Sequence, residues 1–322
     1  MSRIPFFLGN FLVCWTIVWS TVPCYNHRVH ERMRADNLCK RYGPVLALDN
    51  VSLTAYAGEC FGIFGLSGSG KSTLMRMLAG IESPDSGAVS GRPSTLCAQF
   101  PVTEEALSPF EALWFYATMY GIPKGKRQNA VRQALTLVGL DSERNRRIKK
   151  LRGGARKLVE IARTLLSPHN LLLLDDPMAG LDFNIRLRLW EHLLKIRSRD
   201  KVTIIVATAR SEDAEICDRI ALLHEGRVLG IGTPAQLRGL TGPEALVIKP
   251  LKAEKSRKHR GWSGVLSREQ DDSLVVEIGR DSKPVDLLRE ISGDIAGVRM
   301  KNRTLDQVLS AIVRARSSGG LK

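Results

Sequence analysis

The stretch ECFGIFGLSGSGKSTLMRMLAG, residues 59–80, contains three features in one run. It opens with a short apolar segment that is typical of a buried strand. A glycine-rich loop follows, in which Gly65 to Ser72 match the pattern G-x-x-x-x-G-K-[ST]. Behind the loop, apolar residues recur at helical spacing until Gly80. A strand, a phosphate-binding loop and a helix in this order predict an α/β fold of the P-loop type.

The glycine-rich loop carries the residue types that phosphate binding needs. Glycines allow the sharp turns that point backbone N–H groups at phosphate oxygens. Lys71 is expected to reach the β- and γ-phosphates of a nucleotide, and the Ser72 hydroxyl to hold Mg²⁺. The alternative is a glycine-rich turn without a ligand, and the Lys-Ser pair argues against it. The predicted binding residues of the loop are Gly65, Leu66, Ser67, Gly68, Ser69, Gly70, Lys71, Ser72 and Thr73.

A second motif, LLLLDDP at residues 171–177, supplies the acidic half of such a site. The short continuous run of leucines predicts a buried strand. Asp175 ends this strand, and its carboxylate is expected to contact Mg²⁺. The alternative is a buried strand that ends in an acidic turn, and the phosphate loop upstream disfavours it.

Composition sets further bounds. The chain has 322 residues, 43% of them hydrophobic, which suits one large and one small globular domain. Its formal net charge of +15 indicates a polyanionic partner such as a nucleotide, a nucleic acid or an anionic membrane, or else a solvated basic surface. No two of the six cysteines have C-x-x-C spacing, so the pattern supports neither a zinc site nor a disulfide framework.

The N-terminal residues bear on location. Residues 4–25 contain no charged side chain, and about 20 apolar residues suffice to cross a bilayer. Both a transmembrane anchor and a secretory signal peptide fit this stretch. Basic residues follow at Arg28, Arg32 and Arg34, which favours a cytoplasmic position for the next domain. Because ATP is cytosolic, we expect an N-terminal apolar helix over residues 1–26 that serves as an anchor.

The patterns divide the rest of the chain into domains. We expect a linker at 27–36, a nucleotide-binding domain at 37–242 with a helical subdomain at about 104–166, and a small α+β domain at 243–322. Within the second range, VTIIVAT reads as a buried strand and RIALLHEGRVLGIG as a hairpin. In the third range, SLVVEIG and IAGVRM read as strands and TLDQVLSAIVRAR as a helix. The basic run at 249–261 is expected to be a loop.

With its motifs in this order, the chain resembles the ATP-binding cassette of ABC transporters over about residues 37–240. Tyr42 looks like the aromatic residue that stacks on adenine. Gln99 in CAQF looks like the glutamine that touches Mg²⁺ and faces the membrane domain. The segment LRGGA at 151–155 aligns with the family's signature sequence, and AGLD aligns with its D-loop. Besides Tyr42, the resemblance therefore adds four residues of the signature and the D-loop to the predicted nucleotide site: Arg152, Gly153, Gly154 and Asp182.

The segments GECFGIFG, ALWFYATMYGI and TLDQVLSAIVRAR resemble subfamily A, which consists mainly of lipid transporters. In this family two cassettes sandwich two ATP molecules below transmembrane domains, on the cytoplasmic side of the membrane. The resemblance therefore implies a second cassette, identical or different, and membrane domains as partners, with no nucleic acid. Residues 243–322 would be a regulatory domain, and the whole chain a fragment of a longer transporter.

Four positions depart from the family pattern. Asp176 stands where the family has the glutamate that polarises the attacking water, and Thr208 stands where the switch histidine aligns. Arg152 replaces the signature serine, and Ala155 replaces its glutamine. The catalytic candidates are Asp176, Gln99 and Thr208, and two of them, Asp176 and Thr208, differ from the family pattern. Because the binding residues remain, we expect Mg-ATP binding with impaired hydrolysis. The alternatives are a regulatory module that binds ATP without hydrolysis and a soluble ABC ATPase that acts on nucleic acid.

Overall fold

The computed structural model describes residues 30–91, 94–99, 104–241, 243–250, 266–268, 274–277 and 295–317. The anchor predicted over residues 1–26 lies outside the described residues, as does most of the basic run at 249–261. Among the helices of the described ranges, none combines the length and the hydropathy needed to cross a bilayer.

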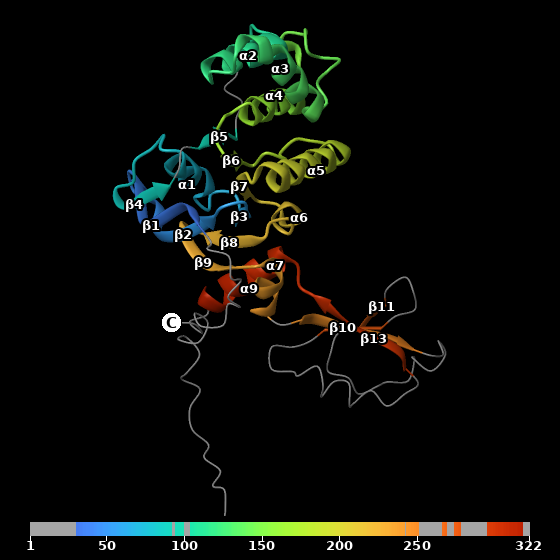
Figure 1. Cartoon of the computed structure of the whole chain (residues 1–322). Helices are drawn as coiled ribbons and strands as arrows, with labels where there is room; N and C mark the ends of the chain where they lie inside the picture. The colour runs from blue at the N-terminus through green and yellow to red at the C-terminus, as the bar shows by residue number, and fades with distance from the viewer. Residues whose placement is uncertain are drawn as a thin grey trace, which may run out of the picture. The chain divides into compact units, whose positions relative to one another are not determined.

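A six-stranded sheet forms the centre of the nucleotide-binding domain (Figure 1). Its order is β5–β6–β7–β3–β8–β9, and its strands are parallel except for β9. The bounds are β3 (Cys60–Phe64), β5 (Thr95–Cys97), β6 (Leu171–Asp175), β7 (Thr203–Thr208), β8 (Arg219–His224) and β9 (Arg227–Gly232). Every residue of β3, β6 and β7 is buried, which explains their continuous apolar sequences. Because parallel strands end at the same edge, these three bring the phosphate loop, Asp175 and Thr208 together.

A second, antiparallel sheet has three strands in the order β2–β1–β4. Its buried side chains belong to the same apolar cluster as side chains of the central sheet. The strands are β1 (Glu31–Tyr42), β2 (Val45–Tyr56) and β4 (Ser86–Gly91). Residues 31–36, which the sequence assigned to a linker, belong to β1. Met33 and Ala35 point into the core with 3% and 1% of their surface exposed. Arg34 stands between them and charged residues flank them on both sides, so this half of the strand reads as polar although one face is buried.

Helix α1 (Lys71–Leu78) begins directly behind the phosphate loop. Its Leu74, Met75 and Met77 belong to one apolar cluster with side chains of both sheets. The packing of this cluster holds α1 against β6, β7 and β2, beside the end of β3 where the loop begins. The position of the loop is therefore set by the core.

The helices predicted between residues 104 and 166 are present (Figure 1). They are α2 (Pro109–Met119), α3 (Lys124–Val138), the short 3-10 helix η1 (Ile148–Lys150) and α4 (Gly153–Leu165). Ser108 caps α2 with a reciprocal bond to Glu111, and α3 ends at Gly139, which has a φ of +74°. Helices α5 (Phe183–Asp200) and α6 (Ser211–Ala214) follow β6 and β7, respectively.

The C-terminal part contains α7 (Pro234–Gly239), a four-stranded sheet and α9 (Leu305–Ser317). The sheet has the order β11–β12–β10–β13, from β10 (Pro243–Pro250), β11 (Leu266–Arg268), β12 (Leu274–Glu277) and β13 (Ile295–Asn302). The two predicted strands and the terminal helix are confirmed, whereas β10 and β11 were not foreseen. Leu305, Val308 and Leu309 of α9 are buried in the same cluster as apolar residues of the central sheet.

Candidate nucleotide-binding site

Two glycines of the phosphate loop, Gly65 and Gly70, are required by close packing. A Cβ atom on Gly65 would lie 2.1 Å from the carbonyl oxygen of Leu223, so no larger residue fits there. Gly70 has a φ of +102°, and a Cβ atom on it would lie 2.5 Å from the carbonyl oxygen of Ala47. The Gly65 amide also donates to the carbonyl of Thr208 at 3.3 Å, which ties the loop to the end of β7.

Lys71 is folded back over the loop. Its ammonium donates to the carbonyls of Gly65 at 2.8 Å and Leu66 at 2.7 Å, and 8% of the residue is exposed. Burial lowers the pKa of this ammonium, while the carboxylates of Asp176 and Asp175 act in the opposite direction. The loop therefore holds a cation beside Asp175, which ends β6, and Asp176, which follows it, where a phosphate group would be neutralised.

Ser72 and Asp175 form the candidate metal-binding pair. The Ser72 hydroxyl lies near enough to the Asp175 carboxylate to influence its pKa. Burial raises the pKa of Asp175, and the Ser72 hydroxyl opposes that rise. A hydroxyl and a carboxylate are oxygen ligands of the kind that Mg²⁺ prefers. The donor set present in the chain thus fits a magnesium ion bound with nucleotide phosphates.

Asp176 has a left-handed backbone, with a φ of +45°. Aspartate tolerates this conformation better than most residues that carry a side chain. The Asp176 amide donates to the carbonyl of Ala207 at 2.8 Å. Burial raises the pKa of the Asp176 carboxyl, and the nearby Lys157 ammonium is the strongest opposing influence. Thr208 is 1% exposed, and its hydroxyl accepts a bond from the Arg210 amide at 3.0 Å.

Gln99 follows β5, and its side chain is exposed. Its carbonyl oxygen accepts a hydrogen bond from the Lys157 ammonium at 3.0 Å. The same ammonium donates to the carbonyl of Asp175 at 3.1 Å, so the Gln99 segment is linked to the end of β6.

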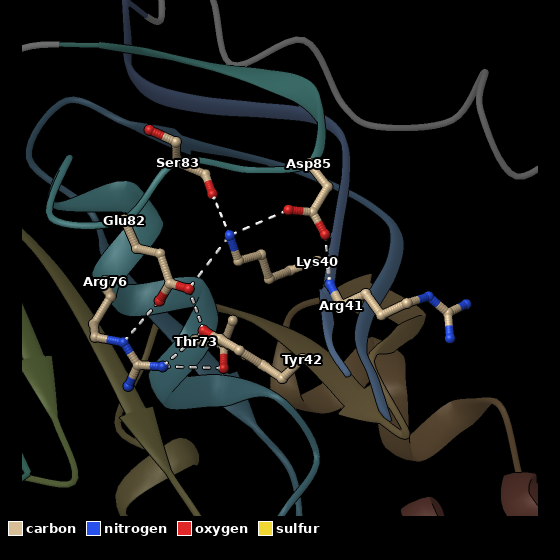
Figure 2. A network of polar contacts seen from close by, with 8 residues as sticks. All are labelled: Lys40, Arg41, Tyr42, Thr73, Arg76, Glu82, Ser83 and Asp85. Carbon is tan, nitrogen blue, oxygen red and sulfur yellow. Dashed lines mark hydrogen bonds and ion pairs between the residues drawn. The ribbon is translucent and has the colours of Figure 1, made fainter. Parts of the chain in front are cut away.

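Tyr42 lies at the end of β1 within a network of charged side chains (Figure 2). Its hydroxyl bonds to Glu82 and accepts from Arg76 at 3.1 Å. Arg76 belongs to α1 and also pairs with Glu82 at 3.0 Å, while Lys40 lies 5.8 Å from the centre of the tyrosine ring. The ring is 41% exposed, so it is held by its hydroxyl while part of its surface remains accessible.

The signature residues form a second group next to the D-loop. Arg152 occupies the N-cap position of α4 with an exposed side chain, and Gly153 and Gly154 open the helix. A Cβ atom on Gly154 would lie 3.0 Å from the carbonyl of Gly180, so signature and D-loop nearly touch. Asp182 caps α5 by accepting a bond from the Ile185 amide at 3.0 Å.

Two features of the site escaped sequence reasoning. One is Lys157, whose buried ammonium donates to two segments that are far apart in the sequence, residues 98–99 and Asp175. Helix α4 also carries Arg156, Glu160 and Arg163, so its sequence does not single out Lys157 as a buried residue. The other is the Arg76–Glu82 pair around Tyr42, for which the sequence offers no periodic pattern.

Comparison with known proteins identifies the family of the chain. A sequence profile described as "ABC transporter" matches residues 48–179, a range that includes the phosphate loop, Gln99, Asp175 and Asp176. Over 62% of this chain and 69% of the relative, the sequence is 34% identical to a Nod factor export ATP-binding protein I of Rhizobium sp. (strain N33). The chain belongs to the ABC transporter family of ATP-binding cassettes.

Other relatives and solved structures support the same family. The putrescine transport ATP-binding protein PotG of Escherichia coli (strain K12) is 33% identical over 75% of this chain and 66% of that protein. Among solved structures, an ATP-binding subunit of an ABC transporter is 26% identical with a TM-score of 0.59, covering 64% of this chain and 92% of the other. The CbiO1 subunit of Clostridium perfringens, part of an ABC transporter complex, is 26% identical with a TM-score of 0.57, covering 64% of this chain and 90% of that one. Family membership makes ATP the expected nucleotide of the site.

Proposed function

We propose that the chain binds Mg-ATP through its phosphate loop, hydrolyses it slowly, and serves as an ATP-binding cassette of a membrane transporter. The observation that carries this proposal is the convergence of Lys71, Ser72 and Asp175 at one edge of the central sheet. Bound Mg-ATP supplies a phosphoanhydride bond whose hydrolysis, in this family, drives transport.

Each residue of the loop has a distinct task in this proposal. Lys71 leaves the carbonyls of its own loop and pairs with the β- and γ-phosphates. Ser72 and Asp175 hold the metal, and Gln99 contributes a further oxygen from the loop after β5. Tyr42 stacks on the adenine ring, with its hydroxyl fixed by Glu82 and Arg76.

Slow hydrolysis follows from two positions. The shorter side chain of Asp176 sets its carboxylate back by one methylene group from where a glutamate would hold it. A misplacement of about 1 Å costs roughly 10²-fold in rate. Thr208 accepts or donates a single hydrogen bond but cannot place a positive charge near the γ-phosphate, as a histidine would. Binding is therefore retained while the attack of water is poorly supported.

The signature group serves a second cassette. Arg152 and the glycines behind it lie on α4, and in a cassette dimer this helix faces the nucleotide of the partner. The guanidinium of Arg152 is exposed and always charged, so it meets a phosphate in place of the usual serine hydroxyl. We propose that the partner is a second cassette, identical or different, and that both sit below membrane domains on the cytoplasmic side.

The names of the relatives point to several different cargoes. The relatives above are named for Nod factor export and putrescine transport, and a further one for sulfate and thiosulfate import. Subfamily A and a lipid cargo therefore remain predictions from the sequence alone. A regulatory module that binds ATP without turnover is the second candidate, and the changes at Asp176 and Thr208 favour it over action on nucleic acid.

A nucleotide titration tests the proposal. Mg-ATP is titrated into the purified full chain, into the variant Lys71→Ala, and into the control Lys126→Ala, whose side chain is exposed on α3. Charged hydrogen bonds contribute roughly 1.5–3 kcal/mol each, so Lys71→Ala should weaken binding at least about tenfold. The control should match the native chain. Equal affinity in all three proteins would exclude the loop as the ATP site.

A further inference from the structure

We propose that Lys157 is a positioning residue, which locks the signature helix α4, the Gln99 segment and the end of β6 into one unit during ATP turnover. This inference rests on the proposed function, because it assigns a task within the same site. It concerns a residue that is outside the phosphate loop and that binds neither nucleotide nor metal in the account above.

The ammonium of Lys157 is buried, and all three of its N–H donors are hydrogen-bonded. Lys157 is 4% exposed. Its Nζ atom donates to the carbonyl oxygens of Ala98 at 2.6 Å, Gln99 at 3.0 Å and Asp175 at 3.1 Å. A lysine ammonium has three N–H donors, so these three carbonyls match its full capacity. Burying a charge is costly unless it is hydrogen-bonded in this way, and a methionine would fill similar space without that cost.

The three acceptors lie on segments with different tasks. Ala98 and Gln99 follow β5, whereas Asp175 ends β6 and precedes Asp176. These carbonyls are backbone groups, so the ammonium fixes the chain itself and leaves the side chains of Gln99 and Asp175 available. A shift of the Gln99 segment is therefore transmitted through one atom to the strand end that carries the acidic pair.

The lysine comes from the helix that begins with the signature. Lys157 lies five positions after Arg152, which is the N-cap of α4. Further along α4, the Arg163 guanidinium donates to the carbonyl of Leu96 at 3.0 Å and pairs with the buried Glu160. Helix α4 is thus attached to β5 and to the loop after β5 at two points. Of the two, the Lys157 contact alone extends to β6, so it joins the signature helix to the acidic residues.

A positioning role predicts a selective effect. Loss of the ammonium should release the Gln99 segment and the end of β6 while the phosphate loop keeps its own contacts. ATP affinity is then retained and the rate of hydrolysis falls. A purely structural role predicts instead that stability and ATP affinity fall together.

The test compares two substitutions with a neighbour on the same helix. Lys157→Met keeps the length of the side chain and removes its donors, and Lys157→Gln keeps two N–H donors without charge. Arg156→Met is the control, because Arg156 donates to the carbonyl of Lys149 at 2.7 Å and pairs with Glu105 within the helical subdomain. For each full chain, Mg-ATP affinity, the rate of hydrolysis of bound ATP beside an L-S-G-G-Q partner cassette, and backbone hydrogen exchange are measured.

For Lys157→Met, we expect ATP affinity within about threefold of the native chain and a rate lower by roughly 10- to 100-fold, as a misplacement of about 1 Å would produce. Hydrogen exchange should become faster in residues 94–99 and 171–176 and stay unchanged in β1 and β2. Lys157→Gln should recover part of the rate, and Arg156→Met should retain both properties.

Two results would overturn the inference. One is native exchange in residues 94–99 and 171–176 of Lys157→Met, because the lysine would then hold neither segment. The other is faster exchange throughout the chain with a matching loss of ATP affinity, because the role would then be structural only. If the native chain itself bound no ATP, the proposed function would fail. The exchange measurement would still show whether Lys157 holds residues 94–99 and 171–176 in place.

Discussion

The backbone amide of Asp176 donates a hydrogen bond of 2.8 Å to the carbonyl of Ala207, the residue directly before Thr208. The two positions that depart from the family's hydrolytic pattern are therefore joined at the ends of neighbouring strands, β6 and β7. Both would act on the same γ-phosphate. This relationship makes their effects on hydrolysis interdependent.

Repair of both positions should exceed the product of the separate repairs. We expect Asp176→Glu and Thr208→His together to raise turnover by more than the two single gains multiplied, because both groups act on one transition state. The assay uses a dimer whose other cassette carries an intact L-S-G-G-Q signature. Glutamate is less suited than aspartate to the φ of +45° at residue 176, so a small loss of thermal stability should accompany the gain. Strictly multiplicative rates would show that the positions act separately.

The Ser72–Asp175 pair should account for the magnesium dependence of binding. Asp175→Asn removes the charge that attracts the cation and keeps the size of the side chain. We expect the ratio of ATP affinities with and without Mg²⁺ to fall toward one, while affinity in the absence of the metal stays near that of the native chain. Titrations in Mg²⁺ and in excess chelator measure this ratio. An unchanged ratio would place the metal elsewhere.

The hydroxyl of Tyr42 should affect the binding of the adenine base of ATP and not the binding of its phosphates. Tyr42→Phe keeps the ring but loses its bonds to Glu82 and Arg76 (Figure 2). A hydrogen bond of this kind contributes about 0.5–1.5 kcal/mol, so ATP affinity should fall roughly two- to tenfold. Binding of inorganic triphosphate, which has no base to stack, is the control and should be unchanged. Equal losses for both ligands would argue against a role in adenine stacking.

Asp213 should give a pH-dependent contribution to stability. It is 4% exposed, and burial raises its pKa, although the Trp190 indole donates to it at 2.8 Å. A carboxyl whose pKa is raised in the folded state favours folding when protonated, and this contribution is lost as the pH rises through the raised value. Asp213→Asn cannot ionise. The Tm of this variant minus that of the native chain should therefore increase from about pH 3 to about pH 7.

A matched control for this series is Asp200→Asn. Asp200 is on the surface, and its hydrogen bond from Arg199 lowers its pKa, which is the opposite direction. Its difference in Tm from the native chain should not increase over the same range. A flat difference for Asp213→Asn would contradict the raised pKa.

Local patterns predicted much of the fold around the candidate nucleotide site. The run from Glu59 to Gly80 gave a strand, a loop and a helix because their apolar periodicities and glycines are continuous in sequence. The LLLL run before Asp175 likewise gave a strand that is buried throughout. Both predictions depend only on neighbours along the chain, which is why they needed no tertiary information.

Features that depend on distant partners were not predictable in this way. The first half of β1 looked like a linker, because only the packing of Met33 and Ala35 shows which face of a polar stretch is buried. The three acceptors of Lys157 lie up to 59 positions away along the chain. The network around Tyr42 joins β1 to α1 and the loop behind it, across a separation of 40 residues. Such contacts arise from the fold and leave no local signature.

The central claim is that this cassette binds Mg-ATP well and hydrolyses it slowly, and the decay of ATP in a saturated site tests it most directly. The native chain and the Asp176→Glu, Thr208→His double variant are each loaded with Mg-ATP at full occupancy beside an L-S-G-G-Q partner cassette that does not itself hydrolyse. Loss of a well-placed base costs about 10²–10⁴-fold. Because Asp176 retains its carboxylate, we expect decay about 10²-fold slower in the native chain than in the variant. A native chain that hydrolyses bound ATP as fast as the variant, at the roughly 1–10³ per second typical of enzymes, would contradict the account.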